Sequence, residues 1–271
     1  MCRILEISKS GYYAWRRATP TRREDDDLEL APLVGAIFHR HRRRYGTRRI
    51  VEELRDMDHA CGRRRVAKLL KTQGLKAIQP KSFKPRTTES RHRLGYSPNL
   101  LLDFEGANRI DQLWVGDITY ISIQGGPFSY LATLMDRFSR RIVGWQLAED
   151  MTEKLVLDAL TAAIRTRQPG PGLMHHTDRG GQYAGAEYRS VLRRAEMRQS
   201  MSRADNCYDN AFMESCFGTF KTELEMTEYE NHATALEEIK SYIAYYNLQR
   251  KHSAIGYLTP AQFEAYLPRP E

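Results

Sequence analysis

The sequence has few cysteines, and none is placed for a metal knuckle or a disulfide framework. The four are Cys2, Cys61, Cys207 and Cys216. No two of them form a Cys-x-x-Cys pair, the spacing that zinc knuckles and redox motifs use. The cysteine content therefore argues against a small disulfide-stapled or zinc-dependent fold, and it is typical of a reducing compartment.

Long apolar runs, a leader segment and internal repeats are also missing. No stretch reaches the roughly 20 apolar residues that a transmembrane helix needs, and Met1 leads into no signal-like segment. We therefore expect no membrane association and a cytoplasmic protein. The 271 residues, 41% of them hydrophobic, are enough for one large or two modest domains with a real core.

Acidic residues are scarce in the first part of the chain. Residues 1–110 contain 25 Lys and Arg against 13 Asp and Glu, a formal charge of +12. Residues 111–271 contain 17 against 21, a formal charge of −4. A basic part joined to a mildly acidic part predicts a polyanion-binding module attached to an enzyme, although a merely soluble basic domain would have the same balance.

The basic part contains short amphipathic helices. Residues 28–40 keep a helical period, Thr47 can cap a second helix, and a third begins at Arg63 and ends at Gly74. Two short helices joined by a turn resemble a helix-turn-helix. Any small bundle with a solvated or protein-docking basic face would share this pattern, but together with the charge it favours DNA contact. The candidate DNA contacts here are Arg48, Arg49, Arg63, Arg64 and Arg65.

The remainder of the chain alternates strand and helix patterns. Three strand-like runs, 114–122, 128–135 and 141–147, are joined by short turns and predict an antiparallel meander. A helix capped by Thr152, a short strand ending at Asp178, a helix at 186–197, a strand at 199–202 and a helix at 209–224 follow. This order predicts an α/β fold with a mixed sheet and flanking helices.

Three carboxylates stand out against these elements. Asp117 lies inside a run that is apolar on both faces, where an ionised carboxylate is costly unless a charge compensates it. Asp178 ends a strand before a Gly-rich turn, a common place for a site. Glu214 lies on a helix at the edge of an apolar stripe formed by Met213, Phe217, Phe220 and Leu224. Two aspartates and a glutamate that converge would bind hard divalent cations.

The spacing and wording of these motifs resemble a known superfamily. Asp178 and Glu214 are separated by 35 residues. The local motifs are Trp114-Val-Gly-Asp-Ile-Thr-Tyr, His176-Thr-Asp-Arg-Gly-Gly-Gln-Tyr and Tyr208-Asp-Asn-Ala-Phe-Met-Glu-Ser. In these features the chain resembles the DDE superfamily of retroviral integrases and bacterial transposases, above all the second-reading-frame (OrfB) transposases of frameshifting insertion sequences.

The resemblance implies a ribonuclease H-like catalytic core preceded by a small all-α helix-turn-helix-like domain. We expect the DNA-binding region with its linker at residues 1–95, and the catalytic core with a C-terminal helical extension at 105–271. Asp117, Asp178 and Glu214 would be the catalytic metal ligands for two Mg²⁺ or Mn²⁺ ions. The expected reaction is DNA strand cleavage and strand transfer at insertion-sequence ends.

Further DNA contacts are expected around this triad. Lys221 follows Glu214 by two helical turns on the same face, where it is well placed for a DNA phosphate; a solvated lysine is the alternative. Asn210 shares the same polar stripe. His176, two residues before Asp178, is either a phosphate-side or supporting group, or a packed strand residue. Gln182 and Tyr183 are implied as DNA contacts by the resemblance alone.

The resemblance also implies partners. They are the double-stranded DNA of the transposon ends and target, further copies of the chain on that DNA, and an upstream-frame OrfA protein or fusion, in a bacterial cytoplasm and on the nucleoid. Two alternatives stay open: a nuclease of the same fold that only hydrolyses, and a non-catalytic DNA-binding remnant. The Arg250-Lys251-His252 tail is expected to brace the core or to reach DNA.

Overall fold

The chain folds into two compact units, Met1–Ile78 and Gln79–Glu271. The computed structural model describes residues 2, 4–16, 22–79, 95–203, 211–225 and 228–267. None of the helices within these residues is long and apolar enough to cross a membrane.

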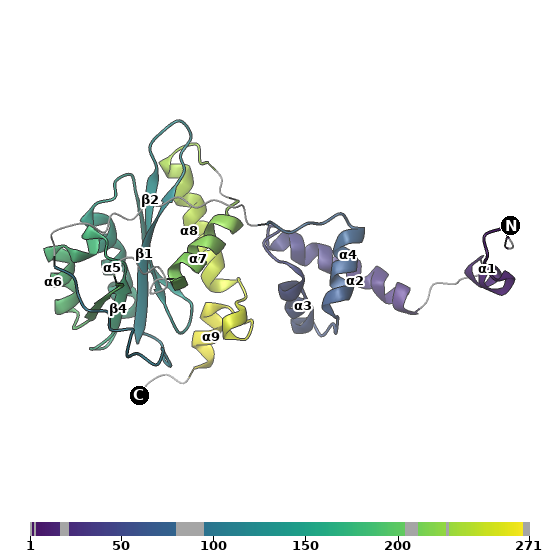
Figure 1. Cartoon of the computed structure of the whole chain (residues 1–271), viewed down its shortest axis with the longest axis horizontal. Helices are drawn as coiled ribbons and strands as arrows, with labels where there is room; N and C mark the ends of the chain where they lie inside the picture. The colour runs from purple at the N-terminus through teal and green to yellow at the C-terminus, as the bar shows by residue number, and fades with distance from the viewer. Residues whose placement is uncertain are drawn as a thin grey trace. The chain divides into compact units, whose positions relative to one another are not determined.

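The first unit is a small helical bundle with an additional N-terminal helix. Its helices are α1 (Lys9–Arg16), α2 (Arg22–Arg40), α3 (Thr47–Asp56) and α4 (Arg63–Thr72) (Figure 1). The last three pack on one another, and they bury Val34, Ile37, Phe38, Ile50, Leu54, Val66 and Leu69. Within each helix these residues recur three or four positions apart, so one apolar stripe per helix closes the bundle.

Two helix ends in this unit show which local signals decide a boundary. At the end of α4, Gly74 has a φ of +67°, and the Leu75 N–H donates to the Leu70 carbonyl over 2.9 Å. This left-handed glycine with its backward hydrogen bond confirms the predicted stop. The prediction that Thr47 caps α3 was wrong by one residue, because Gly46 occupies the extended cap position and Thr47 is already helical.

The second unit is built on a mixed five-stranded sheet. The strands are β1 (Leu113–Ile121), β2 (Ser129–Asp136), β3 (Ile142–Ala148), β4 (Met174–Thr177) and β5 (Arg198–Met201). Their order is β3-β2-β1-β4-β5, which puts β1 in the centre. β1 to β3 form the predicted antiparallel meander, whereas β4 runs parallel to both β1 and β5.

Helices cover both faces of this sheet (Figure 1). α5 (Glu153–Arg167) and α6 (Ala186–Arg194) lie on one side, and α7 (Ala211–Glu223) and α8 (His232–Leu248) on the other. A short helix, α9 (Pro260–Tyr266), follows and contacts α8. The predicted order of three strands followed by alternating helices and strands is confirmed, and with it the α/β class with a mixed sheet.

Alternation along β1 decides which residues meet which helices. Trp114 is fully buried in a core that includes Leu155, Val156 and Ala159 of α5. Successive side chains of a strand point to opposite faces, so Asp117, an odd number of residues away, points to the face of α7 and α8. The central strand thus divides an apolar core on one side from the candidate site on the other.

Two further sequence signals can be compared with the structure. Thr259 and Gln262 form a reciprocal capping box, with Pro260 in the first turn of α9. Thr152 does occupy the cap position of α5, but its side chain accepts no hydrogen bond there.

The packing of α5 on β3 makes one stability prediction. A Cβ at Gly144 would lie 2.4 Å from the Ala159 carbonyl oxygen, whereas one at Gly218 of α7 would meet nothing within 4 Å. Gly144→Ala should therefore lower the free energy of unfolding by about 1–3 kcal/mol, because helix and strand must separate. Gly218→Ala should raise it by about 0.5–1 kcal/mol, as for a helix-interior glycine. Urea unfolding of both variants gives the comparison, and equal midpoints would contradict the close contact.

Candidate active site

Asp117 and Asp178 lie near each other, one on β1 and one directly after β4. The parallel register aligns Val115 with His176, so Asp117 is two residues further along β1, and Asp178 is the first residue after the end of β4. The negative charges of both carboxylates act on the same buried phenol, that of Tyr183. The pairing of β1 with β4 and the turn that follows therefore bring the two carboxylates to one region of the molecule.

The turn after β4 holds Asp178 in position. Its Oδ1 accepts a hydrogen bond from the Gly180 N–H over 2.9 Å, and a Cβ at Gly180 would crowd the same oxygen at 3.1 Å. Asp117 Oδ1 is similarly approached by the Ile118 N–H at 2.8 Å. Both aspartates are part-exposed. Each carboxylate is therefore oriented by a backbone hydrogen bond and is still accessible from solvent.

Tyr183 lies behind both carboxylates. Burial raises the pKa of its phenol well above the ordinary value, and the negative charges of Asp117 and Asp178 raise it further. Its side chain is 3% exposed and packs edge-to-face on Tyr188 at a centroid distance of 5.5 Å. Tyr183 is therefore a protonated group in the wall of the site, where the sequence led us to expect a surface contact.

α7, the helix that contains Glu214, packs against β1. Met213, Phe217, Phe220 and Leu224 are all buried, which confirms the apolar stripe. Of Glu214 the structure describes the backbone but not the side chain. Cys216, two residues later, is buried; this raises the pKa of its thiol to about 12, and the charge of Asp117 contributes. The middle of α7 therefore lies within the electrostatic reach of Asp117. Among the side chains that the structure describes, no cluster of three metal-ligating residues occurs.

Lys221 lies near the C-terminal end of α7, where the negative charge of Asp117 still acts on it. Its Nζ is 3.8 Å from the centroid of the Tyr120 ring, a cation–π contact. Partial burial lowers the pKa of Lys221, and the negative charge of Asp117 acts in the opposite direction. The lysine is thus held as a positive group within the field of the candidate site.

The other predicted contacts of the core have different surroundings. His176 is fully buried, and its two ring nitrogens hydrogen-bond to Ser200 at 2.8 Å and to Ser202 at 3.1 Å on the β5 side. It occupies the position of a packed strand residue, one of the two readings that its sequence position allowed. Gln182 is part-exposed and donates to the Met151 carbonyl over 3.2 Å. Asn210 lies outside the described residues.

Sequence reasoning missed the interaction that anchors the end of α7. Glu223 receives several hydrogen bonds from Arg250, the shortest 2.7 Å, and one from the Tyr242 hydroxyl at 3.0 Å. Glu223 and Arg250 are 6% and 4% exposed, so the ion pair is almost dry. Burial alone would lower the pKa of Arg250, but the carboxylate raises it. Helical periodicity gives no sign of a pair that joins residues 27 positions apart.

The tail therefore braces the core, which was the first of its two expected roles. Lys251 and His252 are also buried, and His252 packs against Tyr246 at 4.6 Å between ring centroids. Phe220 of α7 meets Tyr242 of α8 at 4.4 Å. α7 is consequently fixed along its length by aromatic contacts and at its end by an ion pair.

The predicted arginines of the first unit are not equivalent. Arg48, Arg63 and Arg64 are exposed, and Arg49 is part-exposed beside the Tyr45 ring. Arg65 instead donates to Asp27 over 2.5 Å, a bond that lowers the pKa of that carboxyl. Arg65 therefore ties α4 to α2, which leaves three fully exposed arginines for a ligand.

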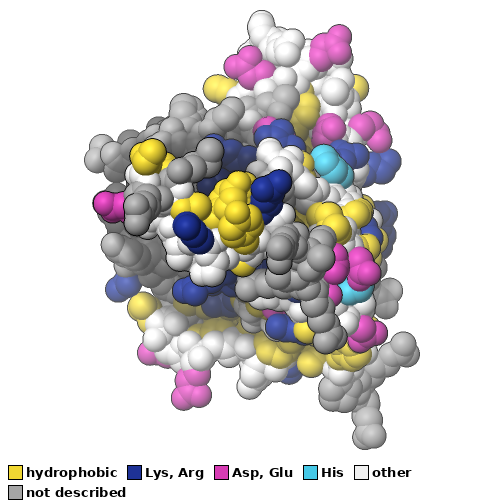
Figure 2. Space-filling model, turned by 90° about the vertical axis from the view of Figure 1, so that its right-hand side faces the viewer, with side chains coloured by type: hydrophobic (Ala, Val, Ile, Leu, Met, Phe, Trp, Pro, Cys, Tyr) yellow, Lys and Arg dark blue, Asp and Glu magenta, His cyan; other side chains and the backbone are white. Residues whose placement is uncertain are grey.

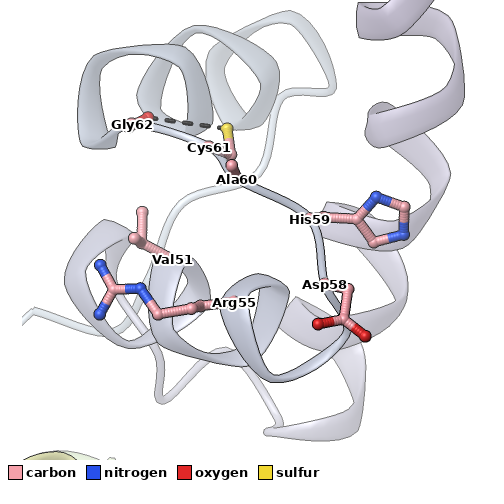
Figure 3. Close-up of a pocket in the computed structure, with 7 residues that line it drawn as sticks. All are labelled: Val51, Arg55, Asp58, His59, Ala60, Cys61 and Gly62. Atoms are coloured by element: carbon pink, nitrogen blue, oxygen red, sulfur yellow. Dashed lines mark hydrogen bonds between the residues drawn. The ribbon is translucent and has the colours of Figure 1, made fainter.

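A cleft opens where α3 and α4 are joined (Figure 3). It has a volume of about 580 Å³ and is lined by Val51, Arg55, Asp58, His59, Ala60, Cys61 and Gly62. Figure 2 shows exposed hydrophobic side chains beside Lys and Arg side chains. The exposed hydrophobics in and before α1 are Ile4, Leu5, Ile7, Tyr13 and Trp15.

Comparison with family models divides the chain in the same way. An HTH-like domain matches residues 24–83, and two integrase core domain models match residues 107–207 and 195–260. The chain is therefore a polynucleotidyl transferase of the integrase type, in which a helix-turn-helix-like module precedes the catalytic core.

Full-length relatives narrow this class. A 31 kDa protein of insertion element IS600 from Shigella sonnei is 40% identical over 97% of both chains. The transposase InsF of IS3A from Escherichia coli K12 is 38% identical over 97% of this chain and 92% of the relative. The transposase of IS904 from Lactococcus lactis is 39% identical over 91% and 98%. The chain belongs to this family of insertion-sequence transposases, and its function is DNA transposition.

Solved structures with a similar backbone fold include two viral ones. The HTLV-2 integrase catalytic core domain, solved with magnesium, matches with a TM-score of 0.41 at 15% identity, over 57% of this chain and 97% of that one. A simian T-cell lymphotropic virus intasome matches with a TM-score of 0.47 at 16% identity, over 89% and 77%.

The dry ion pair at the end of α7 makes a second prediction. Glu223→Gln should lower the free energy of unfolding by about 3–5 kcal/mol, because it leaves Arg250 charged and without its carboxylate in the interior. The double variant Glu223→Leu/Arg250→Met should be close to wild type, because neither charge then remains. Both are measured by urea unfolding, and a double variant as unstable as the single one would contradict this account.

Proposed function

We propose that Asp117, Asp178 and Glu214 are the catalytic residues and that together they hold two Mg²⁺ or Mn²⁺ ions. The observation that supports the proposal is that the charges of Asp117, on β1, and Asp178, directly after the neighbouring strand β4, act on the same buried phenol of Tyr183. The triad would cut the ends of an insertion sequence and join them to new DNA.

The donor set fits such ions. Both aspartates raise the pKa of the same buried phenol, so their charges are concentrated in one place. Two like charges in a part-buried position are unfavourable unless a cation neutralises them. The donors near Asp117 and Asp178 are oxygen atoms, which magnesium and manganese prefer, while the nearby Cys216 is held as a neutral thiol.

Each residue then has a defined task. Two divalent ions, when bound, supply an activated oxygen nucleophile and relief of charge on the phosphate. The two aspartates and Glu214 would hold and orient these ions, and the packing of α7 keeps Glu214 in place. Lys221 brings a positive charge toward the phosphate, and Tyr183 stays protonated behind the carboxylates. The same arrangement serves cleavage by water and attack by a DNA 3′-hydroxyl, which is strand transfer.

DNA binding is divided between the two parts in this proposal. Residues 1–95 would bind the duplex through Arg48, Arg49, Arg63 and Arg64, with Arg65 in a supporting ion pair, and residues 105–271 would perform the chemistry. Asn210 and Gln182 are proposed contacts near the triad, with His176 and Tyr183 supporting it from behind. Cleaving two ends together calls for more than one copy on the DNA, and an OrfA protein or fusion is a further proposed partner, in a bacterial cytoplasm on the nucleoid.

Removing a ligand charge tests the triad. Asp117→Asn, Asp178→Asn and Glu214→Gln each remove a charge but little volume, so each should reduce cleavage and joining of an end-sequence duplex to below a few per cent while duplex affinity stays nearly unchanged. Asp158→Asn is the matched control, because Asp158 pairs with Lys154 on α5, away from this face. Residual cleavage above that level in one of the three would remove that residue from the triad.

The position of Lys221 gives a further prediction. Lys221→Ala should slow single-turnover cleavage at saturating protein at least tenfold, because a charge beside the reacting phosphate is lost. Lys221→Arg should restore much of the rate, since a guanidinium keeps the charge and can stack on Tyr120. Lys240→Ala, on the exposed side of α8, controls for loss of a helical lysine. A wild-type rate for Lys221→Ala would make Lys221 a surface lysine without a role in the chemistry.

A further inference from the structure

Two arginines of the β2–β3 turn stack on one aromatic ring of α7. The guanidinium carbon of Arg137 lies 4.4 Å from the centroid of the Phe212 ring, and that of Arg140 lies 4.2 Å from it. Phe212 is in the first turn of α7, two residues before Glu214. Both arginines are part-exposed. Two positive charges are thus held against the start of the helix that carries the third carboxylate.

No carboxylate in the described residues pairs with either arginine. Asp136, their neighbour in the turn, is engaged by the backbone N–H groups of Phe138 and Ser139 and of Asp111. Arg140 Nε is buried without a hydrogen-bond partner. Burial, together with the adjacent charge of Arg137, lowers the pKa of Arg140 to about 10. The group still carries a full charge at neutral pH.

Other arginines of the same unit show that this is unusual. Arg141, the next residue, pairs with Glu264 at 2.6 Å, Arg167 pairs with Asp111 at 2.8 Å, and Arg250 pairs with Glu223. Each of these is a structural cation with its own anion. Arg137 and Arg140 repel each other and are partly desolvated, an arrangement that folding alone disfavours. An unsatisfied charged pair of this kind points to an anionic ligand.

The position of the pair relative to Asp117 follows from the strand. The Arg137 N–H donates to the Leu113 carbonyl at the start of β1. Asp117 is four residues further along that strand, about 13 Å at roughly 3.3 Å per residue. The arginines thus belong to the end of the sheet at which β1 begins, on the side where α7 starts. α7 accompanies β1, with Phe212 at one end and Lys221 near Tyr120 at the other.

We propose that Arg137 and Arg140 form a clamp for one backbone phosphate of the DNA, beside the start of α7. The clamp rests on the proposed function of the triad. Phe212 fixes both guanidinium planes, so their donors are set for the phosphate before it arrives. Guanidinium groups bind phosphate oxygens with paired hydrogen bonds, which gives geometry as well as charge. The clamp is a positioning device, and it reads no base.

Phosphate neutralisation tests the clamp. Binding of the full chain is measured on a duplex with the end of its own insertion sequence, in which single phosphates are replaced by neutral methylphosphonates. For the wild-type chain, one position near the cut should weaken binding at least fivefold when neutralised. In Arg140→Met and in Arg137→Met, the same substitution should change binding less than twofold, while the remaining positions keep their wild-type effects. Arg140→Lys should keep part of the sensitivity.

Arg165→Met is the matched control, because Arg165 is an exposed arginine of α5 on the opposite side of the sheet. It should leave the whole profile unchanged. Phe212→Leu removes the ring but no charge, and it should weaken the sensitive position without removing it. Because the readout is binding, it is independent of cleavage. Identical profiles for wild type and both Arg→Met variants would overturn the clamp and leave the triad standing, whereas active Asp117→Asn would overturn the triad alone.

Discussion

The repulsion between two neighbouring carboxylates is the constraint on which the rest of the catalytic unit depends. Asp117 is part of the central strand β1, and Asp178 is held in the turn after the neighbouring strand β4 by the Gly180 N–H. Both charges act on the buried phenol of Tyr183, so the fold concentrates negative charge in one region. On the proposed function, bound divalent ions neutralise that charge.

α7 carries the third carboxylate of the proposed site. Its apolar stripe is buried, and Phe220 of that stripe packs on Tyr242. Its end is tied through Glu223 to Arg250. Stacked arginines, Arg137 and Arg140, hold its first turn. A helix fixed at both ends can present a side chain with little freedom, and in this proposal Glu214, close to the start of α7, is that side chain. Order at the reacting centre is thus obtained from contacts that lie outside it.

Local signals were sufficient for the order of the strands and helices along the chain. Strand alternation and turn residues predicted the β1–β2–β3 meander, and Gly74 predicted the end of α4, because each of these depends on residues close in sequence. The roles of the three carboxylates stay a prediction. Pairings between residues far apart in the sequence could not be predicted. The sequence does not reveal that Arg65 forms an ion pair with Asp27, or that His176 hydrogen-bonds to Ser200 and Ser202. The predicted cap of α3 was wrong by one residue, because the residue with extended backbone before the helix is Gly46 and Thr47 is already helical.

The buried Glu223–Arg250 pair has a genetic consequence. Arg250 comes from the last part of the chain, whereas the helix-turn-helix-like unit ends at Ile78. A copy of the gene with a stop codon ahead of Arg250 would leave Glu223 buried without its cation and α7 without its anchor, yet would still encode the first unit intact. On the proposed division of labour, such a decayed copy yields a product that occupies the element's ends without cutting them. Broken copies accumulating in a genome would then restrain the intact ones.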